Sequence, residues 1–363
     1  MSILDDIQAE NIQLNPSAKS IILSAGVRTA QDLDSLLTAF PSLAVDFGIP
    51  SARITAAFMP GFSAVYASAV AGGPPPPMPA MGAVAPPGVI HGLGTRAGIP
   101  SQPSIPITHP SVTSTTTAID LRLHPWPVRD QGRRGTCVAF GATACVEYWQ
   151  GANQPSVPDF SEQFLYYQIK TNSGDPSKTT DGTWLQFARD MFIAPGICHE
   201  RFAPYVGPIQ TGAVAGAPPS QPAITDARGF MINPPTYQRK PASPAATVLS
   251  LLGNGRPVAA SFPVFTDPTT GINNWGSRVG ILYGKVFDPP FHSVANAGHC
   301  VCITGFVPDA AEPTGGYFIF RNSWNTTWSS ASPSPGNSHA PEAGYGEISA
   351  TYVDTYCWEL LQL

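Results

Sequence analysis

The chain has 363 residues, of which 40 are Pro and 34 are Gly, whereas average usage is roughly 5% and 7%. Only 12% of the residues are charged but 43% are hydrophobic, so the chain can form a sizeable core, and its length predicts two folded units of roughly 150 residues each. The net charge of −5 and the lack of a basic patch argue against nucleic-acid binding, and no unbroken apolar run of about 18 residues predicts a membrane span.

The first 60 residues are predicted to form a small helical bundle that serves as a pro-region or a targeting module. Asn15 and Pro16 supply an N-cap and a Pro at the first helical position, and Gly26 is placed to end that helix. A second helix is predicted from the spacing of Leu33, Leu36, Leu37 and Phe40. With three basic residues against six acidic ones, residues 1–60 lack the charge of a DNA-binding module.

Residues 61–118 are predicted to be an extended linker. Arg96 is their only charged residue, and eleven prolines fall between Pro74 and Pro110. This spacing favours a polyproline II conformation, which cannot build a core of its own.

Residues 119–363 show helical patterns first and strand patterns later, which predicts an α+β domain with a helical half and a β-sheet half. Two stretches rich in Pro, Gly and Ser, near 206–246 and 329–343, are predicted to be surface insertions. The predicted helices cover 137–149, 161–170 and 183–193, and the predicted strands cover 256–262, 285–287, 298–306, 317–324 and 345–349.

Cys137 is a candidate nucleophile because it begins a predicted helix. The positive end of the helix dipole lowers the pKa of a thiol there and favours the reactive thiolate. Arg133 and Arg134 add positive charge just before it. The alternative for any free cysteine is a small buried thiol, which is what we expect of Cys145 eight residues further along the helix.

A cysteine nucleophile needs a base and a group that orients the base. Among seven histidines, only His299 begins a strongly apolar strand pattern, GHCVCITGF, where a rigid element can hold its ring. Asn322 ends a later strand pattern, YFIFRNSW, and its amide oxygen can accept a hydrogen bond from an imidazole N–H.

The order of these segments resembles the papain family of cysteine peptidases over residues 119–363. DQGRRGTCVAF (130–140) is similar to the family's nucleophile motif, and SEQFLYY (161–167) to the helix that follows it. GHCVCITGF and YFIFRNSW are similar to the strands that carry the family's His and Asn, and GYGEI (344–348) to its closing strand. The resemblance implies a papain-like two-lobed fold.

The resemblance also implies roles for single residues. Cys137 is the expected nucleophile, His299 its imidazolium partner and general acid, and Asn322 the group that orients the ring. Gln131 is expected to donate its amide to the oxyanion. The predicted substrate-side positions begin with Asp181 and Gly182, which match a Gly-Gly pair that binds extended substrates in the family. Trp184 is a predicted pocket residue, with a helix core residue as the equal alternative. Trp324 is expected to shield the His–Asn hydrogen bond.

Three departures from the family pattern affect the expected cleft. Val138 stands where plant and lysosomal members carry Trp and is similar to bacterial members, so we expect a bacterial-type enzyme. Arg134 stands where those members have a disulfide cysteine, and Asn325 replaces a Gly. A zinc site built from His299 and nearby cysteines is disfavoured, because alternate residues of a strand point to opposite faces; no metal or cofactor is expected.

The sequence therefore predicts a cysteine endopeptidase whose N-terminal region is an intramolecular inhibitor, with part of residues 74–118 crossing the groove in a zymogen-like form. The alternative for this segment is a flexible spacer. The alternatives for the activity are a catalytically silent binding or scaffolding protein and a peptide ligase that uses the same acyl-enzyme. The acidic start of the chain lacks a Sec signal pattern, which predicts a soluble protein that is cytoplasmic or exported by another route.

Overall fold

The computed structural model describes residues 32–33 and most of the chain from residue 117 onward. The predicted bundle over 1–60, apart from the helical pair Asp32 and Leu33, and the linker over 61–118, apart from its last two residues, lie outside the described residues. The described ranges are 32–33, 117–123, 126–152, 154–207, 214–232, 235–239, 241–267, 271–288, 294–310, 312, 314–333 and 338–363.

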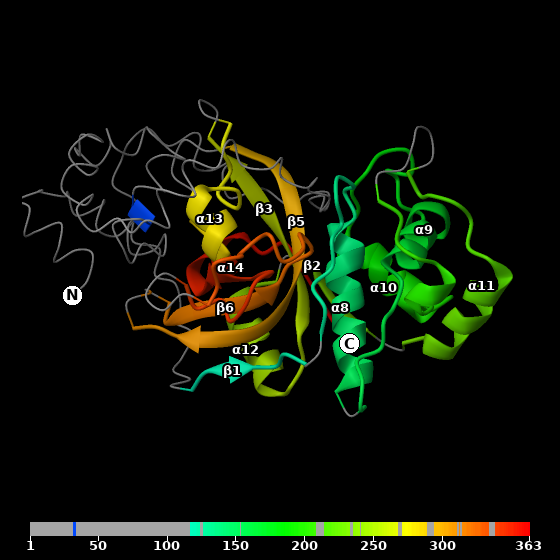
Figure 1. Ribbon diagram of the computed structural model, residues 1–363, viewed down its shortest axis with the longest axis horizontal. Helices are drawn as coiled ribbons and strands as arrows, with labels where there is room; N and C mark the ends of the chain where they lie inside the picture. The colour runs from blue at the N-terminus through cyan, green and yellow to red at the C-terminus, as the bar shows by residue number, and fades with distance from the viewer. Residues whose placement is uncertain are drawn as a thin grey trace, which may run out of the picture.

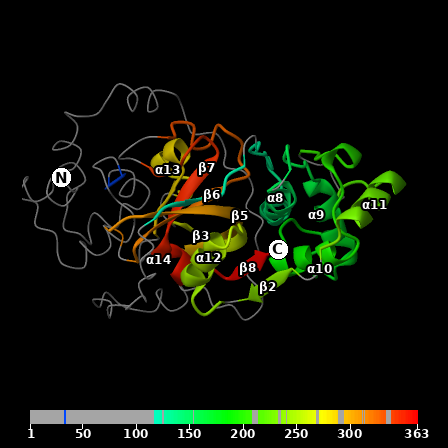
Figure 2. The same ribbon diagram turned by 90° about the horizontal axis from the view of Figure 1, so that it is seen from below.

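The described part has a helical lobe and a sheet lobe, so the predicted α+β architecture with two lobes is confirmed. Two perpendicular views place four helices on one side of the sheet (Figures 1 and 2). These helices are α8 (Cys137–Gly151), α9 (Glu162–Asn172), α10 (Leu185–Ile193) and α11 (Gln221–Ala227). The helices of the sheet lobe are α12 (Pro244–Gly253), α13 (Arg278–Tyr283) and α14 (Ala350–Tyr356). None of the helices in the described part is both long and apolar enough to cross a bilayer.

The eight strands form one sheet in the order β2-β8-β3-β5-β6-β7-β4, with the short β1 beside β5. All pairs are antiparallel except β4 with β7. The strands are β1 (Ile119–Asp120), β2 (Thr236–Arg239), β3 (Val258–Thr266), β4 (Lys285–Val286), β5 (Val294–Pro308), β6 (Gly316–Arg321), β7 (Tyr345–Ser349) and β8 (Glu359–Gln362).

The α8 helix lies between the lobes because it is apolar on nearly all sides. Twelve of its 15 residues are buried, and a helix that is hydrophobic all round must be covered all round. One side packs on β5 and β3, and the other packs on α9 and α10. The interior position of α8 therefore follows from its composition.

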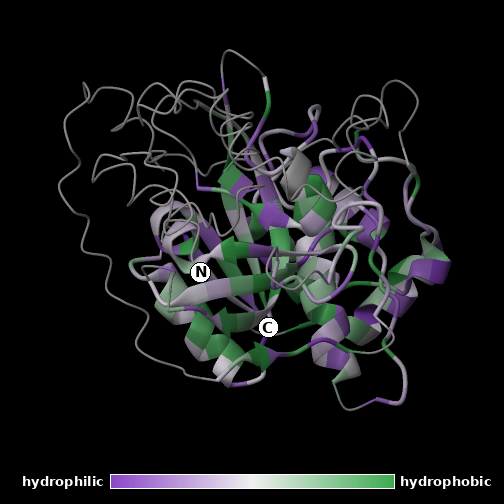
Figure 3. Cartoon of the chain, turned by 60° about the vertical axis from the view of Figure 1, so that its left-hand side comes forward, coloured by the Kyte–Doolittle hydropathy of each residue, from purple (hydrophilic) through white to green (hydrophobic). Residues whose placement is uncertain are grey.

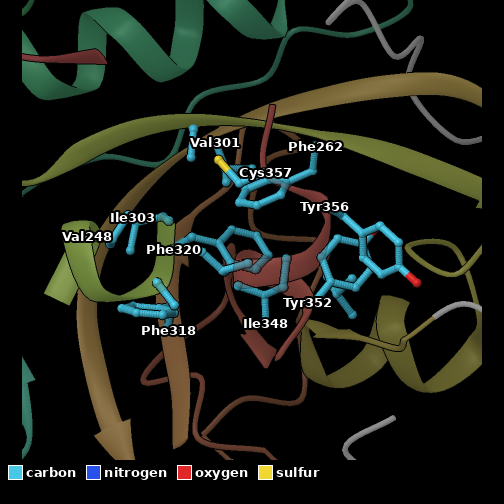
Figure 4. Packing of buried hydrophobic residues seen from close by; sticks show 14 of the residues in the cluster. Val248, Phe262, Val301, Ile303, Phe318, Phe320, Ile348, Tyr352, Tyr356 and Cys357 are labelled. Carbon is cyan, nitrogen blue, oxygen red and sulfur yellow. The ribbon is translucent and has the colours of Figure 1, made fainter. Parts of the chain in front are cut away.

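The alternation of side chains along the strands divides the sheet between two cores. Cys300 and Cys302 of β5 belong to the core of the helical lobe, whereas Val301 and Ile303 belong to the core behind the sheet. Figure 4 shows Phe262, Val301, Phe320 and Tyr352 pointing into that second core, and Figure 3 shows hydrophobic residues concentrated on the strands. His299 has the parity of Val301, and its ring contacts Trp275 and Trp324, which belong to the core of the sheet lobe.

Each helix and strand predicted within residues 119–363 corresponds to an observed element, whereas α11, α12, α13, α14, β1, β2 and β8 were not predicted. The region near 206–246 is more than a surface insertion, because it contains α11 and the edge strand β2, which pairs with β8. The strand β8 and the helix α14 have no strong pattern of their own, and both lie in the 14 residues that follow β7.

Candidate active site

An imidazole and an amide form the centre of the site. His299 lies on β5, and Asn322 directly follows the neighbouring strand β6. The Nε2 atom of His299 lies 2.8 Å from Oδ1 of Asn322, which also accepts a hydrogen bond from the Ser323 backbone N–H. Because an amide oxygen only accepts hydrogen bonds, the proton sits on Nε2, and Nδ1 is the basic nitrogen of the neutral ring.

Two tryptophans enclose the ring. Trp324 stacks on His299 with ring centroids 4.4 Å apart and an interplanar angle of 25°, and Trp275 meets the ring edge-on at 5.1 Å. Both indoles are almost completely buried, so they exclude water from the His299–Asn322 hydrogen bond. Trp324 thus lies against His299 and its shielding role stays a prediction. The sequence analysis did not identify Trp275.

The α8 helix brings the thiol of Cys137 to the same interface. Cys137 is the first residue of α8, as predicted, and Gly141 lies one turn further along the same face. Gly141 is so close to β5 that a Cβ atom there would lie 2.9 Å from Sγ of Cys300, the residue after His299. The first turn of the helix therefore places the thiol beside Cys300, the residue that follows His299 on β5.

Burial determines the charge of the imidazole. Cys137 and His299 are both fully buried. Burial lowers the pKa of His299 to about 4, and the hydrogen bond with Asn322 opposes this effect only in part. The ring is therefore neutral at pH 7 in this structure. Burial also raises the pKa of the Cys300 thiol, and the proximity of Cys137 contributes to the same effect.

Gln131 is attached to the same corner of the molecule. Its Nε2 atom donates to the Arg134 carbonyl at 2.9 Å, and its Oε1 atom accepts from Oγ of Ser323 at 2.5 Å. Its backbone N–H donates to the Ser323 carbonyl, so two bonds join it to the residue after Asn322. An amide nitrogen carries two N–H bonds, which allows Gln131 to hold Arg134 and to donate to a substrate oxyanion as well.

These features lie within a region that a family model describes. The model of the papain family of cysteine proteases matches residues 115–332. The chain belongs to this family. It is a papain-like cysteine peptidase, and the match agrees with the resemblance that the sequence motifs indicated.

Solved structures of similar fold are themselves cysteine proteases. Xylellain from Xylella fastidiosa aligns with a TM-score of 0.51 at 20% identity, over 69% of this chain and 87% of that chain. Bromelain from Ananas comosus, in complex with the E64 inhibitor, gives 0.40 at 20% identity, over 67% and 96%. The ragweed pollen allergen Amb a 11 in its proform gives 0.44 at 19% identity, over 69% and 66%. At this identity the alignment with xylellain shows the fold.

Asp181 and Gly182, the predicted substrate-binding pair, lie beside Gly135 in the loop that precedes Cys137, here called the nucleophile loop. The Asp181 carboxylate accepts hydrogen bonds from the Gly135 backbone N–H and the Tyr166 hydroxyl, both at 3.1 Å. Gly182 is buried, its N–H donates to the Gly135 carbonyl, and its carbonyl accepts from the Lys170 ammonium. The role of Gly182 in binding the substrate backbone stays a prediction, and a substrate would have to share these two groups with the protein.

Two other residues lie differently from what their sequence context suggested. Trp184 packs against the core of the helical lobe and stacks on Phe187 with centroids 5.1 Å apart, which favours the core residue over the pocket residue. The Arg134 guanidinium donates to Oε1 of Gln163 and to the Val206 and Val214 carbonyls, rather than serving the thiol. It joins three segments of the helical lobe at the position where relatives have a disulfide cysteine.

The predicted exclusion of a zinc site rests on strand parity, and the side chains follow that parity. His299 contacts Trp275 and Trp324, whereas Cys300 and Cys302 pack into the helical lobe. Within the described ranges, no group of three or more His, Cys, Asp or Glu side chains is arranged to hold a metal ion.

Tyr205 and Arg321 are two further residues of the site that sequence analysis missed. The Tyr205 hydroxyl donates to the Gln131 carbonyl and lies 2.8 Å from Oγ1 of Thr136, so it braces both ends of the nucleophile loop. Nothing in the sequence pointed to these contacts of Tyr205. Arg321 is buried beside Asn322.

Proposed function

We propose that the protein hydrolyses internal peptide bonds of polypeptides, with Cys137 as nucleophile, His299 as acid and base, Asn322 as the orienting group and Gln131 in the oxyanion hole. The observation that carries this proposal is the 2.8 Å contact between His299 and Asn322 beneath Trp324, with His299 on strand β5, which packs against the helix that begins at Cys137. This arrangement supplies a thiol, a base and an orienter in the roles that covalent catalysis requires.

The reaction proceeds through an acyl-enzyme. Sγ of Cys137 attacks the peptide carbonyl carbon while its proton passes to Nδ1 of His299. His299 then gives this proton to the leaving amine as the C–N bond breaks, and water deprotonated by His299 hydrolyses the thioester. The Gln131 amide and the Cys137 backbone N–H stabilise the oxyanion in both steps, and Asn322 keeps the ring in the required tautomer.

The test compares two cysteines of one helix. Cys137→Ala is expected to abolish cleavage of a fluorogenic peptide, whereas Cys145→Ala, at another buried position of α8, is expected to retain it. An epoxide inhibitor of cysteine peptidases is expected to label Cys137 alone. Wild-type cleavage by Cys137→Ala would refute the proposal. No labelling or cleavage by the wild type, either intact or after proteolytic cleavage between residues 61 and 118, would favour the binding-protein alternative. Products formed with an added amine would reveal ligation.

We further propose that the full-length chain is a zymogen-like form. The thiol and the imidazole are both inaccessible, so a substrate can reach them only after a movement of the chain. Asp32, in the N-terminal region, forms a buried ion pair with Lys285 of β4 at 2.8 Å, and Lys285 also lies 3.8 Å from Glu347. This pair supports a bundle that is anchored on the sheet lobe; the path of residues 74–118 lies outside the described residues.

A single tryptic cleavage tests the zymogen proposal, because Arg96 is the only Lys or Arg between residues 61 and 118. Limited trypsin treatment of the full-length chain is expected to cut after Arg96 and to raise peptidase activity. The matched Arg96→Gln variant is expected to resist both changes. Cleavage at Arg96 that separates residues 1–96 without raising activity would leave the spacer interpretation in its place.

A further inference from the structure

Arg321 is a buried cation that the proposed chemistry does not use. It is the last residue of β6 and precedes Asn322, and its side chain is 3% exposed. It pairs in register with Cys302, so it projects from the face of the sheet that meets the helical lobe, whereas Asn322, the next residue, bonds to His299. Arg321 thus links Asn322, which orients the His299 ring, to the interface between the two lobes.

The partner of Arg321 lies on the helix that carries the nucleophile. Nη1 of Arg321 lies 2.9 Å from Oε2 of Glu147 in α8, and the Glu147 side chain is 1% exposed. The same carboxylate oxygen accepts from Nε1 of Trp126 at 2.9 Å, and the Arg321 guanidinium lies over the Trp126 ring, 4.4 Å from its centroid. Glu147 follows Cys137 by ten residues along one rigid helix, so fixing it fixes the axial position of the thiol.

A third contact reaches the segment that leads to the oxyanion donor. Nη2 of Arg321 donates to the Pro127 carbonyl, four residues before Gln131. Arg321 is therefore joined to the strand of Asn322 by the chain itself, to the helix of Cys137 through Glu147, and to the segment of Gln131 through Pro127.

We propose that Arg321 is a positioning residue for catalysis, which sets the register of α8 against β6 and so the distance between the Cys137 thiol and the His299 ring. This inference rests on the proposed function of these residues. The planar guanidinium holds a carboxylate, a carbonyl and an aromatic face at once. A lysine ammonium at this position would keep the charge but could not satisfy all three contacts. A displacement of about 1 Å between reacting groups can cost about 100-fold in rate.

The decisive variant removes both charges of the pair. Arg321→Met combined with Glu147→Leu leaves no unpaired buried ion, so the protein is expected to fold. The expected kcat falls about 100-fold with KM nearly unchanged, and the acid limb of the pH profile moves because the thiol–imidazole distance has changed. Arg321→Lys is expected to fall between this variant and the wild type. Glu312→Gln is the matched control, because Glu312 is equally buried but binds Thr314 and Thr351 in the sheet lobe.

A structural role alone gives a different result. If the double variant folds and keeps the wild-type kcat and pH profile, Arg321 does not position the catalytic groups. If the double variant fails to fold, Arg321→Lys decides, because a wild-type kcat and pH profile in that variant would equally overturn the proposal. The proposed function is read separately from Cys137→Ala and from labelling of Cys137, so its failure is distinguishable from failure of the role assigned to Arg321.

Discussion

Gly141→Ala tests whether the contact between α8 and β5 sets the geometry of the site. An added Cβ atom would lie 2.9 Å from Sγ of Cys300, 3.3 Å from the backbone carbon of Val301 and 3.4 Å from its nitrogen. Apolar contacts are normally about 3.5–4.0 Å, so the helix must retreat or Cys300 must rotate. The retreat required is at most about 1 Å, and it occurs one turn from Cys137.

Two opposing effects decide the stability of this variant. Alanine is favoured over glycine inside a helix by about 1 kcal/mol, whereas overpacking a tight contact costs about 1–3 kcal/mol. We therefore expect the free energy of unfolding to change little or to fall by up to about 2 kcal/mol. A retreat of about 1 Å lowers kcat by up to about 100-fold. The loss of activity is thus expected to exceed the loss of stability.

The assay pairs urea unfolding with steady-state kinetics, and Gly253→Ala is the control. Gly253 ends α12, and a Cβ atom there would meet no atom within 4 Å, so this variant is expected to be at least as stable as the wild type with unchanged kcat. Adding Cys300→Ala to Gly141→Ala removes the nearest atom and is expected to restore part of the activity. If Gly141→Ala alone behaves like Gly253→Ala in both assays, the close approach of helix and strand does not control the site.

Two further predictions concern buried ions. Burial raises the pKa of Glu359 from 4.5 to about 7, so the folded state keeps a proton that the unfolded state loses, and stability falls by about 3 kcal/mol as the pH rises from about 4.5 to 7. Urea unfolding at several pH values should show that Glu359→Gln lacks this fall in the free energy of unfolding. The opposite pH dependence that His299 contributes is present in both proteins and cancels in the comparison. Parallel plots of stability against pH for the two proteins would contradict the prediction. Lys170 and Asp175 form an ion pair with both side chains 0% exposed. Lys170→Met leaves the Asp175 charge unpaired and is expected to lower the free energy of unfolding by about 3–5 kcal/mol in the same assay, whereas a loss below about 1 kcal/mol would contradict this prediction.

The sequence predicted the elements whose own residues determine them. The start of α8 at Cys137, the strand around His299 and the position of Asn322 after β6 all follow from local periodicity and from motif order. The strand β8 has only four residues and includes the buried Glu359. Its place depends on pairing with β2 and β3, which no local pattern encodes.

The supporting residues of the site could not be predicted in the same way. Glu147 and Arg321 are 174 positions apart, and Trp275 meets His299 only after a loop of the sheet lobe has folded. A charged residue in an apolar helix is a sign that a buried partner exists, but it does not identify the partner. Strand parity alone would have placed Arg321 on the face of the sheet that meets the helical lobe. Its position along that face follows only from its register with Cys302 of β5, which the structure provides.

Access to the site and the charge of its base depend on the same burial. In the proposed mechanism, proton transfer from Cys137 to His299 creates a cation on a ring whose pKa burial lowers to about 4. A movement that admits a peptide also admits water, which removes part of that effect and makes the imidazolium less costly to form. Exposure would therefore increase both substrate access and the reactivity of the thiol. Under the zymogen proposal, the chain cut at Arg96 should therefore react faster near pH 6 than the intact chain, even with a thiol reagent small enough to enter the closed form. If the N-terminal region blocked the site only by steric exclusion, such a small reagent would react with both forms at the same rate.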